Sequence, residues 1–402
     1  MKTNYWLIII LALLSPSQLG VHFWPEWSLV SGIRVDYLSP TIYLSDLFFS
    51  GLFIITAVKF RHSKFLKILF SVFFILLLFS GRGNISSVYW TLRYLQIPTL
   101  AWLIFVNGNS FSFTKDIKKY LSFSLIFVLF LEVWQFIIKK STGWWWIFGE
   151  RSFSLSTPNI ATVDLFGQEF LRPYATFSHP NALAGWLLLV MFILWNSKPK
   201  RLLALAGILL TFSRNALLAV IAGTIFYSAL TGRNALFSIV SFSQNSIGER
   251  LILNQSALKV FFDHPVSGVG PGKLLSVLPE YFPPGFWSLQ PPHNIYFLIL
   301  AETGIIGLTI LIVGILYLYL LLRRNPAVFP GLAAVISTSL LDHYWLTSQQ
   351  NRILLGIFLG LGLVRSFRGN YQTPVTTVSF GKRRNVRSGR KLHVNNSSFS
   401  RS

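Results

Sequence analysis

The sequence has no cysteine and very little charge. Charged residues make up 12% of its 402 residues, against 52% hydrophobic residues, whereas a soluble domain has about 25% charged residues. The absence of cysteine excludes disulfides and thiolate chemistry. No run of His, Asp and Glu stands at metal-ligand spacing, and the acidic residues Glu249, Asp263 and Glu280 are scattered over one loop. We therefore expect no metal and no cofactor.

The sequence contains many long apolar runs, and each run of about 18 residues or more is a candidate transmembrane helix. The sequence predicts an all-α polytopic membrane protein with about ten transmembrane helices, and with room for up to twelve. The predicted spans lie near residues 5–20, 41–58, 65–80, 88–106, 120–138, 181–197, 202–229, 294–322, 327–343 and 352–365.

Two of these spans leave an alternative open. The first has signal-peptide features, with Lys2 before an apolar core and then "SPSQLG", but no A-x-A-like cleavage site stands out. An uncleaved first helix is therefore favoured. The run 202–229 is interrupted at Ser213 and Arg214, so it is either a broken helix or two short helices.

The distribution of basic residues predicts the topology. The net charge of +22 would suggest nucleic acid in a soluble protein, but in a membrane protein the placement of the charge matters more. With the N-terminus in the cytoplasm, the basic loops all fall inside, and only Asp116 is acidic among them. These loops contain Lys59, Arg61, Lys64, Lys115, Lys118, Lys119, Lys198, Lys200, Arg201, Arg323 and Arg324. Both termini are therefore expected in the cytoplasm.

This topology divides the chain into four parts. Residues 1–230 form an N-terminal transmembrane bundle with an outer loop at about 139–180, and residues 231–293 form a large extracytoplasmic loop region with short helices. C-terminal transmembrane helices follow at 294–365, and 366–402 is a basic tail with too little apolar content for a core. Within the large loop, 249–262 has helical apolar spacing and ends in a glycine- and proline-rich turn.

Polar motifs gather at the predicted outer face. They are "RPYATFSHPNALAG" from Arg172, "TFSRNALLA" with Arg214, "ERLILNQSALKVFFDHPVSGVGPG" with Arg250, and "HNIYFLILAETG" from His293. Arg93 adds a cation six residues inside a predicted span. Because charged groups are costly in a membrane, each is a functional candidate.

The order of these motifs resembles the O-antigen ligase and polymerase superfamily of bacterial membrane glycosyltransferases, which use polyprenyl-diphosphate-linked sugars. The resemblance covers Arg172 to Gly307, about a third of the chain, and "DHPVSGVGPG" with the following His293-Asn294 is its most specific part. Members often have two further spans before the catalytic loop, but here "NALFSIVSF" is too short to cross a bilayer. The resemblance implies metal-independent, inverting transfer at the outer face of a bacterial inner membrane.

The residue types suit that chemistry. A diphosphate leaving group needs positive charge, and the planar guanidinium of arginine donates two hydrogen bonds to phosphate and stays charged. We therefore assign Arg214 and Arg250 as catalytic cations, with His293 as the base that deprotonates an acceptor hydroxyl. The donor-binding residues predicted beside them are Arg172, Arg93, Gly270 and Asn294.

Each assignment has a structural alternative. The arginines could extend to lipid headgroups or pair with Glu169, Glu249 or Glu302, and for Glu302 an arginine partner is favoured over a role as base. His293 could simply cap its helix. The glycines of the turn, Gly270 among them, could serve packing alone.

The predicted function is an O-antigen ligase-like transfer of a glycan from a polyprenyl-diphosphate carrier to a hydroxyl on a glycan, lipid or protein. A polymerase has the same chemistry with a different acceptor and stays open. A transporter or flippase is the alternative of another class, but the chain has no visible internal repeat and its polar motifs gather at one face. The expected partners are the lipid-linked donor, the acceptor and the bilayer, and not nucleic acid.

Overall fold

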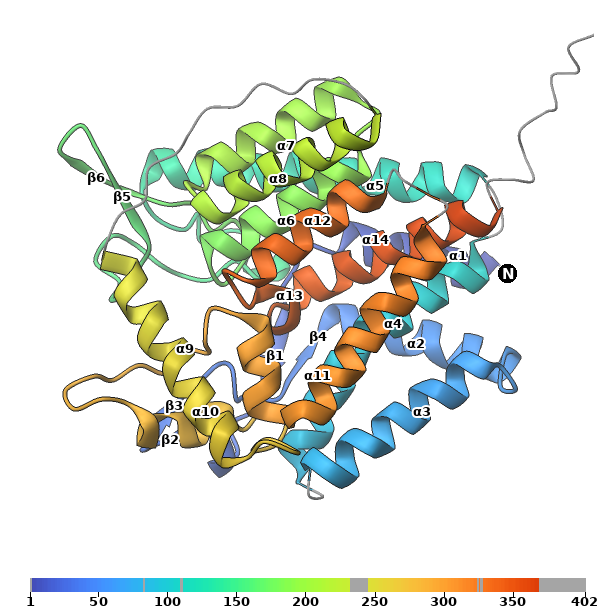
Figure 1. Cartoon of the computed structure of the whole chain (residues 1–402). Coiled ribbons are helices and arrows are strands. Elements are labelled where there is room, and N and C mark those ends of the chain that lie inside the picture. Colours follow the sequence, from blue (N-terminus) through green and yellow to red (C-terminus); the bar gives the residue numbers. More distant parts are fainter. Residues whose placement is uncertain are drawn as a thin grey trace, which may run out of the picture.

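A computed structural model of the chain describes residues 2–81, 84–108, 111–231, 245–323, 325 and 328–368. Over these residues the protein is mostly helical (Figure 1), which confirms the helical fold class. The segment "NALFSIVSF", the first residues of the predicted 231–293 region and most of the basic tail lie outside the described residues.

The N-terminal part of the chain supplies most of the helical bundle. Its helices are α1 (Lys2–Leu13), α2 (Leu44–Lys59), α3 (Lys64–Leu76), α4 (Ile85–Asn107), α5 (Phe111–Ile138), α6 (Pro180–Ile193), α7 (Lys198–Leu210) and α8 (Arg214–Thr231), and a π-helical turn, η2 (Leu77–Gly81), follows α3. Helix α6 is buried along its whole length. It therefore forms the centre of the apolar core, as a helix that is hydrophobic all round should.

The C-terminal helices complete this bundle. They are α11 (Ile295–Leu322), α12 (Phe329–Ser339), α13 (Tyr344–Thr347) and α14 (Gln349–Arg368). Helix α14 packs against α4 and α6, and α12 packs against α8. Trp186 of α6 and Trp345 of α13 are among the largest fully buried side chains. Helix α1 begins and helix α14 ends on the same side of the bundle (Figure 1).

Short elements lie together at the opposite end of the bundle (Figure 1). Three two-stranded antiparallel sheets form there, pairing β1 (Gly20–His22) with β4 (Thr41–Tyr43), β2 (Leu29–Val30) with β3 (Ile33–Arg34), and β5 (Thr162–Leu165) with β6 (Gln168–Leu171). Their registers place Gly20 opposite Tyr43, Leu29 opposite Arg34 and Thr162 opposite Leu171. The helical elements of this end are η1 (Glu26–Ser28), η3 (Trp146–Phe148), α9 (Asn245–Asp263), α10 (Leu274–Val277) and η4 (Leu278–Tyr281).

The number of membrane spans stays a prediction. Among the described residues, Ser112–Ile138 and Ile295–Leu322 are long and apolar enough to cross a membrane by themselves. The run 202–229 forms two short helices, α7 and α8, because the chain turns at Phe212, whose φ is 53°. The predicted spans 5–20 and 327–343 are too long, since their helices end at Leu13 and Ser339.

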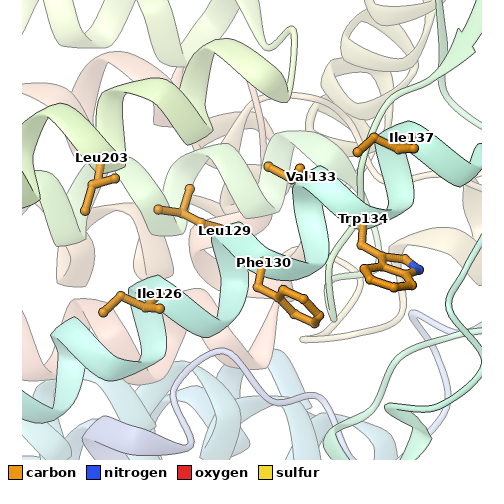
Figure 2. Close-up of a pocket in the computed structure, with 7 residues that line it drawn as sticks. All are labelled: Ile126, Leu129, Phe130, Val133, Trp134, Ile137 and Leu203. Atoms are coloured by element: carbon orange, nitrogen blue, oxygen red, sulfur yellow. The ribbon is translucent and has the colours of Figure 1, made fainter.

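A groove on the outside of the bundle runs along α5. Its walls are the α5 side chains of Ile126, Leu129, Phe130, Val133, Trp134 and Ile137 together with Leu203 of α7 (Figure 2). These residues recur at helical spacing, and Trp134 and Ile137 are 48% and 70% exposed. An apolar, exposed stripe on one of the two long apolar helices is what a lipid-facing surface requires.

Helix α11 is not continuous, because it breaks at Gly304. This glycine has φ 61° and ψ −160°, a conformation that is essentially restricted to glycine. Residues 265–272, called the glycine-rich loop below, pack into the break. The N–H groups of Val269 and Gly270 donate to the carbonyls of Ala301 (3.0 Å) and Glu302 (2.8 Å), and the N–H of Ile305 donates to the Pro265 carbonyl at 2.9 Å. The loop therefore satisfies backbone groups that a broken apolar helix would leave unpaired.

Replacing Gly304 by alanine is expected to destabilise the protein. A Cβ at this position would lie 2.4 Å from the Val266 backbone, at a φ that alanine rarely adopts. We expect a loss of about 2 kcal/mol, measured as a lower midpoint of thermal unfolding in detergent. Gly314→Ala is the matched control, since a Cβ there meets nothing within 4 Å; equal midpoints for the two variants would contradict the expected strain.

Candidate functional site

A chain of polar contacts links three segments at the end of the bundle that carries the short elements. Arg172, just after β6, donates through Nε to the Thr211 carbonyl and through Nη2 to Asn181 Oδ1, both at 2.9 Å. Asn181, in the first turn of α6, donates from Nδ2 to Asp342 Oδ2 at 3.1 Å. The chain therefore joins Arg172 to a carboxylate that the sequence places 170 residues later.

The segment just before Asp342 forms hydrogen bonds with α9 and with the residue that precedes α11. Arg250 of α9 donates from Nη1 to the Leu341 carbonyl at 3.0 Å, and Asn294 donates from Nδ2 to the Leu340 carbonyl at 3.2 Å. Asn294 also caps α11, because its Oδ1 accepts the N–H of Tyr296 at 2.9 Å. Two predicted site residues, on different helices, therefore meet at one turn after α12.

His293 faces the same carboxylate. Its Nδ1 lies 3.7 Å from Asp342 Oδ1, and its side chain is 15% exposed against 5% for that of Asp342. The ring of His343 lies 5.3 Å from the ring of His293, centroid to centroid. His343 is itself held, because its Nδ1 lies 2.8 Å from Thr347 Oγ1. The cluster defined by Arg172, Arg214, Arg250, His293, Asp342 and His343 is called the outer cluster below.

The electrostatics of the outer cluster are dominated by cations. Burial and the charges of Arg214 and Arg250 together lower the pKa of Arg172 to about 10, so Arg172 still carries its charge at neutral pH. Burial alone would raise the pKa of Asp342, but His293, His343 and Arg250 outweigh it and hold that pKa below its usual range. Burial lowers the pKa of His343 to about 4. Arg172 and Arg250 interact with the one carboxylate and Arg214 interacts with Arg172, so the cluster carries a net positive charge that attracts an anionic ligand.

Five predicted site residues therefore come together. Arg172, Arg250, His293 and Asn294 contact one another through Asn181, Asp342 and the backbone of 340–341. Arg214, the first residue of α8, is half-buried, and it lies close enough to Arg172 for its positive charge to lower the pKa of Arg172.

Arg93 and Gly270 have other surroundings. Both Nη atoms of Arg93 donate to Asp46 of α2, at 2.6 and 2.8 Å, and the same guanidinium contacts Gln349 and the Thr41 carbonyl. Gly270, at φ 111°, packs against the broken part of α11, and a Cβ there would lie 2.8 Å from the Ser80 carbonyl. These contacts favour the structural alternative at both positions, because neither residue contacts the outer cluster through them.

The predicted arginine partner of Glu302 is wrong. The Glu302 carboxylate is fully buried and accepts hydrogen bonds from Tyr37 at 2.9 Å and Tyr94 at 2.5 Å. The backbone N–H groups of Gly272 and Leu274 also bond to it. Glu302 therefore links the glycine-rich loop to Tyr94 of α4 and to Tyr37, in the segment between β3 and β4.

Sequence reasoning missed Asp342 and His343. Both were placed inside the predicted span 327–343, but α12 ends at Ser339 and the chain turns over 340–343. The available signal was an aspartate and a histidine next to each other at the end of an apolar run. Ionisable residues at such a place should count as functional candidates in the same way as Arg93.

The donor atoms of His293, Asp342 and His343 all lie within 4.8 Å of one another. Two imidazoles and a carboxylate are ligands that Zn²⁺ accepts. The expectation that the chain binds no metal rested on spacing along the sequence, and spacing could not reveal this cluster because His343 follows His293 by 50 residues.

Comparison with known proteins supports the resemblance drawn from the motifs. Residues 173–312 match the family model described as O-Antigen ligase. The matched range contains Arg214, Arg250, His293 and Asn294, begins one residue after Arg172 and ends before Asp342. No curated protein matches the chain. Members of the matched family are glycosyltransferase-like ligases and polymerases and integral inner-membrane proteins.

Proposed function

We propose that the chain transfers a glycan from a polyprenyl-diphosphate carrier to a hydroxyl acceptor at the outer face of a bacterial inner membrane. The observation that carries the proposal is the outer cluster itself. Arg172, Arg250 and His293 gather around one buried carboxylate, and Arg214, from a fourth sequence motif, lies close enough to Arg172 to lower its pKa. The family match over residues 173–312 supports the same reaction class.

In this proposal the arginines hold the diphosphate. Negative charge grows on the diphosphate as the bond between the anomeric carbon and the phosphate oxygen breaks, and preorganised cations stabilise it. Arg250 uses one Nη for the Leu341 carbonyl, and Arg172 uses Nε and Nη2 for Thr211 and Asn181. A guanidinium has five N–H donors, so each keeps donors for phosphate oxygens while its direction is set by the protein.

His293 is the proposed base. Its Nδ1 faces Asp342, which leaves Nε2 to accept the proton of the acceptor hydroxyl as the new bond to the anomeric carbon forms. Asp342 acts as a positioning residue, because its negative charge near Nδ1 favours a proton on that nitrogen, which leaves Nε2 free, and stabilises the ring once both nitrogens are protonated. A single displacement of this kind inverts the anomeric centre.

The acceptor decides between ligase and polymerase. We favour a ligase-like activity, in agreement with the description of the matched family model, and keep a polymerase as the alternative. In a deletion strain, lost surface attachment with lipid-linked chains retained would indicate a ligase, and lost ladder lengths would indicate a polymerase.

The decisive experiment is transfer by the purified full-length protein in lipid nanodiscs, given a polyprenyl-diphosphate glycan and a hydroxyl acceptor without added metal. The expected result is a glycosylated acceptor together with free polyprenyl diphosphate in equal amounts. Movement of the lipid-linked donor across liposomes without glycan transfer would instead indicate a flippase and would contradict the proposal.

The proposed topology has both termini in the cytoplasm. The N-terminus and the end of α14 lie on one side of the bundle, while α9 and the β5–β6 hairpin lie on the other (Figure 1). The basic turn between α2 and α3 lies on the same side as the N-terminus (Figure 1), as the positive-inside rule requires. The outer cluster would then face the periplasm.

A further inference from the structure

We infer that His293, Asp342 and His343 form a binding site for a divalent transition-metal ion such as Zn²⁺. The three donor atoms lie within 4.8 Å of one another. Tetrahedral zinc with bonds of about 2.1 Å sets its donor atoms roughly 3.4 Å apart, which small side-chain rotations can reach. Two imidazoles and one carboxylate leave a fourth position for water or another ligand.

The nitrogen of His293 is available for coordination. His293 Nδ1 is enclosed by protein and has no hydrogen-bond partner among the described residues, and its distance of 3.7 Å from Asp342 Oδ1 is too long for a hydrogen bond. A buried polar atom without a partner is costly. An ion placed between this nitrogen and the carboxylate would satisfy both.

The other two ligands are held in orientations that suit a metal. Thr347 Oγ1 donates to the His343 carbonyl at 3.2 Å, so it accepts a hydrogen bond from His343 Nδ1 at 2.8 Å. The free electron pair of His343 is therefore on Nε2. Asn181 donates to Asp342 Oδ2 at 3.1 Å and leaves Oδ1 toward His293. Such outer hydrogen bonds orient the ligands of metal sites in general.

The surrounding charge restricts the kind of ion. The positive charge of Arg250 lowers the pKa of both Asp342 and His343. The same charge repels any metal ion bound beside these residues. Hard ions such as Mg²⁺ and Ca²⁺ depend on oxygen ligands and on negative charge, of which this site has one carboxylate. Zn²⁺ or Co²⁺ binds through directional bonds to imidazole nitrogen, and these are what the site offers.

The consequence for activity rests on the proposed function. A metal on Nδ1 of His293 takes the electron pair of that nitrogen, so the remaining ring proton sits on Nε2. The ring can then no longer accept a proton from the acceptor hydroxyl. Zn²⁺ would therefore inhibit glycan transfer reversibly, and a chelator would restore it.

The test begins with metal binding, which is independent of activity. Untagged full-length protein in detergent is titrated with Co²⁺, followed by visible absorption, and with Zn²⁺ by calorimetry. We expect one ion per chain. His343→Ala should weaken binding at least tenfold, and Thr347→Val, which keeps the side-chain shape, should weaken it by roughly tenfold through the lost orienting hydrogen bond. His264→Ala, a histidine of the outer loop away from the cluster, should bind as the wild type does.

Two outcomes would overturn the metal site. One is the absence of saturable Co²⁺ and Zn²⁺ binding, and the other is binding that His343→Ala and Thr347→Val leave unchanged. Inhibition is then measured in the transfer assay, where Zn²⁺ should inhibit the wild type and much less the His343→Ala variant. If no transfer occurs in any variant but Co²⁺ still binds, the proposed function fails and the metal site stands.

Discussion

Replacement of His293 by alanine should reduce glycan transfer by a factor of about 10² to 10⁴, the usual contribution of a general base. The reason is geometric, since His293 Nδ1 faces Asp342 and its Nε2 is left for the acceptor hydroxyl. The measurement is the initial rate of acceptor glycosylation in nanodiscs. Added imidazole should restore part of the lost rate, because a small base can occupy the space left by the ring.

The matched control is His264→Ala. His264 also belongs to the outer part of the chain, at the end of α9, and its backbone N–H donates to the Val260 carbonyl at 3.1 Å. Its removal should leave the rate close to that of the wild type. Full activity of the His293→Ala variant, with normal membrane insertion, would exclude His293 as the base.

The second large effect is expected at Arg214 and Arg250. Alanine at either position should lower the transfer rate by about 10² to 10³, as removal of one preorganised donor to a developing negative charge does. Lysine should restore only part of the rate, because it keeps the charge but lacks the planar pair of donors. The rate and the apparent affinity for the lipid-linked donor are measured together.

Each arginine has a control on its own part of the fold. Arg201, in the first turn of α7, donates to the Trp195 carbonyl at 3.0 Å, and Lys259 is an exposed cation on α9, nine residues after Arg250. Alanine at these positions should change the transfer rate little. If Arg201→Ala and Lys259→Ala reduced transfer as strongly as Arg214→Ala and Arg250→Ala, the effect would come from general charge or folding and not from diphosphate binding.

The helical character of the chain and the order of its site motifs were predictable. Apolar runs leave the backbone of a membrane segment with few alternatives to a helix, and stretches rich in glycine and proline end helices, as residues 265–272 do after α9. The turn at Ser213 was visible for the same reason, as an interruption of an apolar run. These features depend on neighbours in the sequence, which any local pattern contains.

Some site residues have surroundings that the sequence did not predict, because their partners are far away in the sequence. Arg93 looked like a free intramembrane cation until Asp46, 47 residues earlier, was found to pair with it. Gly270 looked like part of a sugar site, but it packs on the break of α11 at Gly304. Asp342 was hidden because its partner Asn181 lies 161 residues away.

The sequence by itself determined a mostly helical, strongly apolar chain with cationic motifs in a recognisable order, because hydrophobicity and turn chemistry act over a few residues. Only the tertiary structure decided which cations meet. It brought Arg172, Arg250 and His293 to one carboxylate and gave Arg93 and Glu302 other partners, since long-range pairing follows from how helices pack and not from spacing along the chain.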